Sequence, residues 1–336
     1  MVRSGCLCSM PHESKTRMNP SPSTEERTWA VLAHLSALAF GMGILLPILG
    51  WSEQRRKSKY ASFQCLQALG YQSLGYTIWL LSYLVLVILL SIVFMITAAT
   101  AESGSRALGT ATVIFMLAIF GLLGLYLLLP VIAAIACGFG RDFRYPLLGT
   151  RLAKYLDFQP ANEQAVSMIE QHEERWVASM GHFSVIIPLW GLLAPITTWI
   201  LQGKHSHLLK FQSMQTTIYQ GIVNLLYLGA GGVYFFGILL MFMTMILTGD
   251  GGMSTPAGII SFILFLLSFL IAALIGLAIP LFHILGQWAG YRLLKGDNYR
   301  YPILGKLVEK RLSSYGVQER ASASNGKPLD STKENS

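Results

Sequence analysis

The chain has 336 residues, of which 53% are apolar and only 12% are charged, and its formal net charge is +8. So few charges argue against a soluble globular protein, and an excess of Lys and Arg is expected where membrane-protein loops lie beside anionic headgroups. The composition therefore predicts an integral membrane protein whose main partner is the lipid bilayer, and gives no support for nucleic-acid binding.

The first residues contain no apolar run of the kind that forms a signal peptide. Met18 begins the run Met-Asn-Pro-Ser-Pro-Ser-Thr-Glu-Glu-Arg, which is typical of a bacterial start. We therefore interpret residues 1–17 as an upstream extension.

The rest of the chain contains an internal repeat. Residues 25–72 recur without a gap as residues 173–220, and each copy closes with the motif Arg-Tyr-Pro-x-Leu-Gly, at 144–149 and at 300–305. Such self-similarity indicates a tandem duplication of one structural unit. The expected division is an unstructured start (1–24), a first membrane repeat (25–155), a linker (156–172), a second membrane repeat (173–312) and an unstructured tail (313–336).

Long apolar blocks follow one another along both copies. The blocks without Asp, Glu, Lys or Arg are 28–52, 60–101, 107–140, 176–203, 211–249 and 251–291. About 20 apolar residues suffice for a helix to cross the bilayer core. The pattern predicts an all-α, polytopic integral membrane protein.

The first block of each copy, 28–52 or 176–203, is interrupted by Gly and Pro, which weaken a helix interior. If this block returns to the side that it entered from, all Lys and Arg except Arg106 lie on one side of the membrane. The positive-inside rule favours this re-entrant arrangement over the alternative, a kinked full span. Each repeat is then a short broken segment plus two long transmembrane helices, with both termini cytoplasmic and the chain in the inner (plasma) membrane.

Polar residues open the second block of each copy at helical spacing. They are Gln64 and Gln67 in the first copy, and Gln212 and Gln215 in the second. Residues three apart share one face of a helix. Two interpretations remain: amide hydrogen bonds that pack the helices together, or a polar lining for a translocated substrate.

His34 and His182 occupy equivalent places in the two broken blocks. A membrane histidine is commonly a neutral hydrogen-bonding partner, and Ser36 and Ser184 supply the nearest hydroxyls in sequence. A titratable group inside a membrane is also a functional hypothesis by default. The two histidines are therefore candidates for the same packing or lining role as the glutamines.

Catalytic and metal-binding motifs are missing from the sequence. It has no His-Glu-x-x-His, no Gly-x-Ser-x-Gly and no phosphate-binding loop, and its four cysteines have neither metal-ligand spacing nor a disulfide framework. We expect no catalytic residues, no cofactor and no metal.

Glu-Arg-Thr-Trp-Ala-Val-Leu-Ala-His-Leu-Ser at 26–36, the Pro-containing apolar run, the Phe-Gln-x-x-Gln stretch and the closing Arg-Tyr-Pro carry a family resemblance. They resemble a bacterial membrane family of unknown function that is distantly similar to the twenty-kilodalton channel subunit of the chloroplast inner-envelope import translocon (Tic). The resemblance covers 25–155 and 173–312. It implies a membrane fold, and single-unit members imply that such units pair.

Two classes of function remain. The first is a non-enzymatic scaffold or passive conduit in membrane transport or protein translocation, with membrane-protein partners or self-association. The alternative is a membrane-embedded enzyme that acts on lipids.

Overall fold

The computed structural model describes residues 21–100, 105–158, 168–248 and 255–325, and these residues form helices and connections without a strand. The elements of the first repeat are α1 (Thr24–Leu35), η1 (Ser36–Ile44), α2 (Leu45–Gln54), α3 (Lys59–Thr100), α4 (Ser105–Gly138) and α5 (Leu148–Leu156). Those of the second are α6 (Glu170–Phe183), η2 (Ser184–Ile186), η3 (Trp190–Leu192), α7 (Leu193–Gln202), α8 (His207–Thr248), α9 (Pro256–Leu294) and α10 (Leu304–Asn325). The chain is thus an all-α protein of two helical repeats, as the sequence predicts.

The first broken block is a hairpin. A capping box of Ser23 and Glu26 starts α1, and the chain breaks at Phe40, whose φ of 49° lies in the left-handed region. The amide of Gln54, at the end of α2, donates to the carboxylate of Glu25, at the start of α1, at 2.9 Å. Since the two ends of the block contact each other, its two arms fold back on one another.

A glycine makes this reversal possible in both copies. A Cβ on Gly43 would lie 1.8 Å from the carbonyl oxygen of Ser36, and a Cβ on Gly191 would lie 2.0 Å from that of Ser184. No side chain fits at such a separation, so the arms approach as closely as they do because the residue is Gly. The second hairpin is also closed at its base, where the Ser206 hydroxyl donates to Glu174 at 2.6 Å.

Long antiparallel helix pairs follow each hairpin, α3 with α4 and α8 with α9. Within the described parts of the chain, five helical segments are long and apolar enough to cross a membrane: 24–54, 59–97, 109–138, 207–248 and 256–294. Segment 24–54 qualifies by length and composition, but it is the folded-back hairpin just described. The two long pairs supply the membrane-crossing helices.

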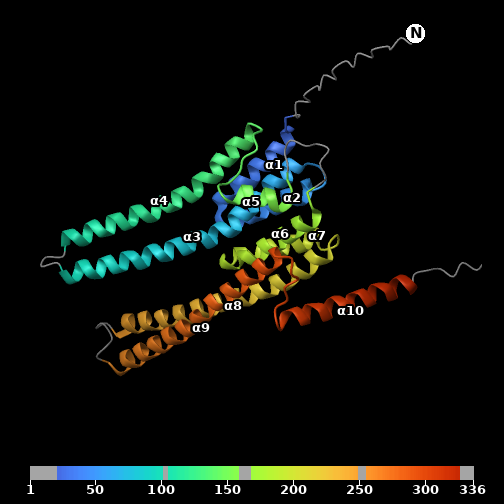
Figure 1. Cartoon of the computed structure of the whole chain (residues 1–336). Helices are drawn as coiled ribbons and strands as arrows, with labels where there is room; N and C mark the ends of the chain where they lie inside the picture. The colour runs from blue at the N-terminus through green and yellow to red at the C-terminus, as the bar shows by residue number, and fades with distance from the viewer. Residues whose placement is uncertain (1–20, 101–104, 159–167, 249–254, 326–336) are drawn as a thin grey trace, which may run out of the picture.

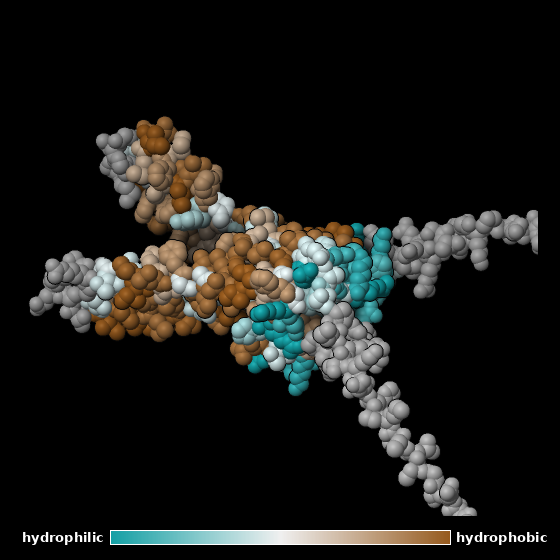
Figure 2. Space-filling model, turned by 90° about the horizontal axis from the view of Figure 1, so that it is seen from above, coloured by the Kyte–Doolittle hydropathy of each residue, from teal (hydrophilic) through white to brown (hydrophobic). Residues whose placement is uncertain are grey.

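Figure 1 shows that the two pairs extend in the same general direction, while both hairpins lie at the opposite end of the molecule. The copies are therefore similarly oriented, as an even number of crossings per unit requires. Figure 2 shows apolar surface along the pairs and polar surface gathered at the hairpin end. The apolar surface includes Ile78, Leu81 and Ile96 on α3, which are 60% or more exposed.

The segment that follows each Arg-Tyr-Pro motif is helical. α5 ends at Leu156, and Asp157 caps it in the left-handed conformation with a φ of 55°. Its counterpart α10 continues to Asn325, inside the range 313–336 that the sequence predicts to be unstructured. The predicted start at 1–17, much of the linker and the last residues of the tail lie outside the described residues.

Candidate functional site

His34 joins three parts of the first repeat. Its ring is fully buried; Nδ1 lies 3.0 Å from the hydroxyl of Tyr145, and Nε2 lies 3.0 Å from Oε1 of Gln64. Because an amide oxygen only accepts, the Nε2 atom carries the proton and Nδ1 accepts from the tyrosine. The hairpin, the start of α3 and the segment between α4 and α5 thus meet at one imidazole. We call this segment, residues 139–147, and its counterpart between α9 and α10, residues 295–303, the exit segments.

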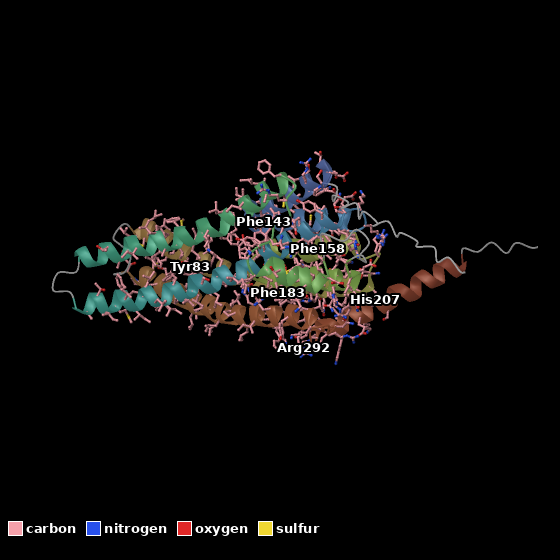
Figure 3. All side chains as sticks on the ribbon, turned by 45° about the horizontal axis from the view of Figure 1, so that its top comes forward. Tyr83, Phe143, Phe158, Phe183, His207 and Arg292 are labelled. Atoms are coloured by element: carbon pink, nitrogen blue, oxygen red, sulfur yellow. The ribbon has the colours of Figure 1, made fainter. Side chains whose placement is uncertain are left out.

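The glutamines extend this contact to the backbone of the exit segment. The Gln64 amide donates to Asp142 at 2.9 Å and to the carbonyl of Phe143 at 3.1 Å. Gln67 donates to the same carbonyl at 2.9 Å and accepts from the backbone N–H of Tyr145, also at 2.9 Å. Figure 3 shows Phe143 at the hairpin end of the molecule, away from Tyr83 on the long pair.

The second repeat builds the same cluster. His182 contacts the hydroxyl of Tyr301 at 3.0 Å and Oε1 of Gln212 at 3.2 Å, and Gln212 donates to the carbonyl of Tyr299 at 3.2 Å. Gln215 donates to the same carbonyl at 2.9 Å. We call these two clusters the histidine clusters; their members are His34, Gln64, Gln67 and Tyr145 in the first repeat, and His182, Gln212, Gln215 and Tyr301 in the second.

The prediction that Ser36 and Ser184 are the hydroxyl partners of the histidines is wrong. Ser36 donates to the carbonyl of Ala33 at 2.7 Å, and Ser184 donates to that of Gly181. These serines accept instead from Gln72, at 2.9 Å, and from Gln220, at 3.1 Å. The repeat keeps the histidine, the serine and the glutamine, but the tyrosine of Arg-Tyr-Pro is too far along the chain for local spacing to pair it with the histidine.

Burial fixes the protonation of the exit segment. It raises the pKa of Tyr145 and of Tyr301 well above the ordinary value, so both hydroxyls stay neutral donors. Burial also raises the pKa of Asp142, and the Arg144 guanidinium at 3.1 Å opposes that rise. The described residues contain no group of three or more His, Cys, Asp or Glu that could hold a metal ion. The hydrogen bonds just described join each histidine cluster to parts of its own repeat.

A second polar contact joins the repeats. The indole N–H of Trp51 donates to Glu173 at 2.8 Å, and Arg55 forms ion pairs with Glu170 at 2.8 Å and with Glu174 at 3.4 Å. Burial raises the pKa of Glu173 to about 7, against the Trp51 hydrogen bond and the positive charge of Arg55, which lower it. The sequence analysis missed this contact, although the repeat keeps both Trp51 and Glu173.

The repeats contact each other through unequal faces. Trp176 of α6 donates to the carbonyl of Leu66 on α3 at 3.0 Å, and its ring lies against Gly70. The equivalent residues of the other copy are Thr28 on α1, which is exposed, and Ile218 on α8. This part of the repeat-to-repeat interface is therefore built from α3 of the first copy and α6 of the second, and the corresponding faces of α8 and α1 do not form it, whereas the equivalent arms α2 and α7 pack on each other.

Both repeats match the sequence profile of one family, at residues 25–152 and at residues 173–308. The chain belongs to the magnetosome magnetite crystal formation protein family. Since the profile of this bacterial membrane family matches twice, each repeat corresponds to one unit of the family, and both histidine clusters lie inside the two matched ranges. No curated protein and no solved structure matches the chain. The distant similarity to the chloroplast translocon subunit stays a prediction beside this family membership.

Proposed function

We propose that the protein is a non-enzymatic scaffold in a membrane at which magnetite crystals form. The single observation that carries the proposal is the match of both repeats to the magnetosome magnetite crystal formation family. The scaffold presents two hairpin modules on one side of the bilayer and the far ends of the two long helix pairs on the other.

A scaffold explains the histidine clusters better than a conduit does. A conduit needs polar groups that are free to meet a passing substrate, whereas His34, Gln64 and Gln67 are fully buried and bond one another and the exit segment. Buried polar networks in which each member has a partner make a fold rigid and unique. We assign all six candidate residues, His34, His182, Gln64, Gln67, Gln212 and Gln215, to packing.

Helix length supports a position for the hairpins near one membrane surface. At 1.5 Å per residue, α3 is roughly 60 Å long, about twice the thickness of the bilayer core. The lipid-facing stretch from Ile78 to Ile96 alone accounts for roughly 27 Å. The first part of α3, which packs against the hairpin, has a similar length, so it extends through the headgroup level to the cytoplasmic side and leaves only the apolar tip near Phe40 beside the core. We place this end and both termini in the cytoplasm.

The test uses a magnetite-forming bacterium that lacks its own members of the family. We expect the full chain to change the size distribution of its crystals, measured by electron microscopy, and we expect a His34→Ala, His182→Ala double variant to fail. Immunoblots of the isolated membranes control for the amount of each variant. An inserted wild-type chain that leaves crystal size unchanged contradicts the proposed function.

Lipid turnover by the purified protein is the matching test of the enzymatic alternative. We expect no release of phosphate or fatty acid from bilayers above that of an empty-membrane control. Turnover that His34→Ala abolishes would contradict a purely structural role.

A further inference from the structure

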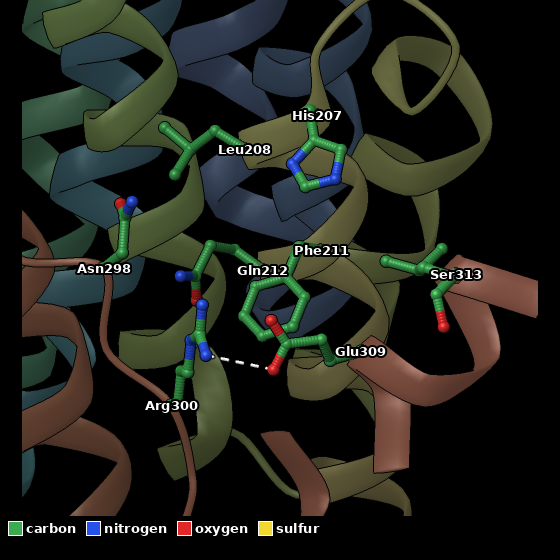
Figure 4. Close-up of a pocket in the computed structure, with 9 residues that line it drawn as sticks. His207, Leu208, Phe211, Gln212, Asn298, Arg300, Glu309 and Ser313 are labelled. Carbon is green, nitrogen blue, oxygen red and sulfur yellow. Dashed lines mark hydrogen bonds and ion pairs between the residues drawn. The ribbon is translucent and has the colours of Figure 1, made fainter. Parts of the chain in front are cut away.

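One pocket distinguishes the second repeat from the first. It has a volume of about 310 Å³ and lies between the start of α8, the exit segment and α10. Its lining residues are His207, Leu208, Phe211, Gln212, Asn298, Arg300, Glu309, Leu312 and Ser313. Figure 4 shows the ring of Phe211 at its centre, with the Arg300–Glu309 ion pair beside it.

The first repeat fills the equivalent place with its own side chain. There the ring of Phe158 stacks on Phe63, with 4.1 Å between centroids and 5° between planes. Asp157 ends α5 in the left-handed conformation, and the N–H of Phe158 then donates to the carbonyl of Ala153 at 2.8 Å. The chain turns back at this point and lays its aromatic ring on the helix below.

The second repeat keeps the receiving surface but not the occupant. Phe211 matches Phe63, and the guanidinium carbon of Arg300 lies 5.8 Å from the Phe211 ring, as that of Arg144 lies 5.9 Å from Phe63. When the Arg-Tyr-Pro motifs are aligned, the position of Phe158 is Ser314, and α10 continues through it instead of ending. Among the residues whose side chains the structure describes, which end at Ser314, no aromatic ring stacks on Phe211.

We propose that this pocket receives an aromatic side chain carried on an extended segment of a partner protein. The occupant in the first repeat defines the chemistry: a ring that lies against the part of Phe211 that remains exposed, 8% of that residue, and against Leu208 and Leu312, which also line the pocket. Arg300 adds a cation beside the aromatic pair.

The surroundings suit a peptide. A larger polar hollow of about 630 Å³ shares His207, Leu208 and Asn298 with the pocket. This hollow is lined further by Glu170, Glu174 and Arg175, and Nη1 of Arg175 is buried without a hydrogen-bond partner among the described residues. Polar groups on either side of the docked ring would therefore find donors and acceptors next to the pocket. This inference stands independently of the proposed function.

The test measures binding of the ring that fills the first repeat, Phe158, supplied on a separate peptide. A fluorescent peptide with the sequence of residues 154–162, and the same peptide with Phe158→Ala, are titrated by anisotropy against the full-length protein in nanodiscs, with empty nanodiscs as the blank. We expect the Phe peptide to bind about tenfold or more tightly than the Ala peptide, because burial and stacking of the ring are lost with Ala.

Two tryptophan variants locate the binding. Ser313→Trp should fill the pocket and weaken the Phe peptide to the level of the Ala peptide, whereas Lys310→Trp, on the same helix but outside the lining, should leave its affinity unchanged. Binding that does not depend on Phe, or that survives Ser313→Trp, overturns the proposal. It is also overturned if only a chain without residues 315–336 binds the peptide, since the protein's own tail would then be the occupant.

Discussion

Substitution of His34 by Ala tests whether the histidine clusters hold each repeat together. The substitution removes two hydrogen bonds, each worth about 1 kcal/mol, and leaves the buried hydroxyl of Tyr145 without its partner, which costs a further 1 to 3 kcal/mol or so. The vacated ring volume adds a cavity penalty. We expect the free energy of unfolding to fall by about 3 to 5 kcal/mol.

The assay is SDS-driven unfolding in mixed micelles, followed by tryptophan fluorescence. His283→Ala is the matched control, because His283 is a half-buried membrane histidine with one partner, Tyr227 at 3.1 Å, and no counterpart in the first repeat. We expect it to cost about 1 kcal/mol. A double-mutant cycle of His34→Ala with Tyr145→Phe should give a coupling energy of about 1 to 2 kcal/mol. Strict additivity, or equal losses for the two histidines, would refute the reasoning.

Three further predictions follow from the same geometry. Gly43→Ala should abolish the folded hairpin, seen as loss of monodisperse protein in size-exclusion chromatography, whereas Gly121→Ala, with no atom within 4 Å of its added Cβ, should elute as wild type. Glu173 has a raised pKa of about 7, so its charge opposes folding. The wild type and a Glu173→Gln variant should be equally stable near pH 4.5, and the wild type should then lose up to about 3 kcal/mol relative to the variant as the pH rises through 7. A difference between the two that does not depend on pH would contradict this. In a cysteine-free chain, Arg56→Cys should resist a membrane-impermeant thiol reagent in intact cells and react after lysis, while Ser103→Cys should react in intact cells; the reverse pattern would place the hairpins outside.

Much of the fold follows from sequence periodicity and charge. Two copies, charge-free blocks and the positive-inside rule predict the helix pairs and the hairpins, because bilayer thickness and loop charge act on composition alone. Gly residues in the broken blocks indicate a weakened helix, but the contact of Gly43 and Gly191 with a carbonyl across the hairpin depends on how two arms cross. Such a crossing is set by tertiary packing, which no local pattern records.

The candidate site was predicted in part. The sequence singled out the histidines and glutamines because polar residues in apolar blocks stand out, yet it left packing and lining undecided. Tyr145 and Tyr301 complete the clusters from far along the chain, and their motif carried no sign of its partner. The contact of Trp51 with Glu173 joins two copies, so the repeat within one copy could not predict it.

The unequal faces of the two copies give the chain a direction. Trp176 fits over Gly70 only when the second repeat follows the first, because the reverse order would set Thr28 against the branched side chain of Ile218. Duplication began with interchangeable halves, and these substitutions have since removed that interchangeability. Residues on the open side of α1, such as Thr28, fit against no other repeat, whereas Trp176 on α6 must fit against α3. The two halves are therefore no longer exchangeable in the chain, although its sequence still displays two copies.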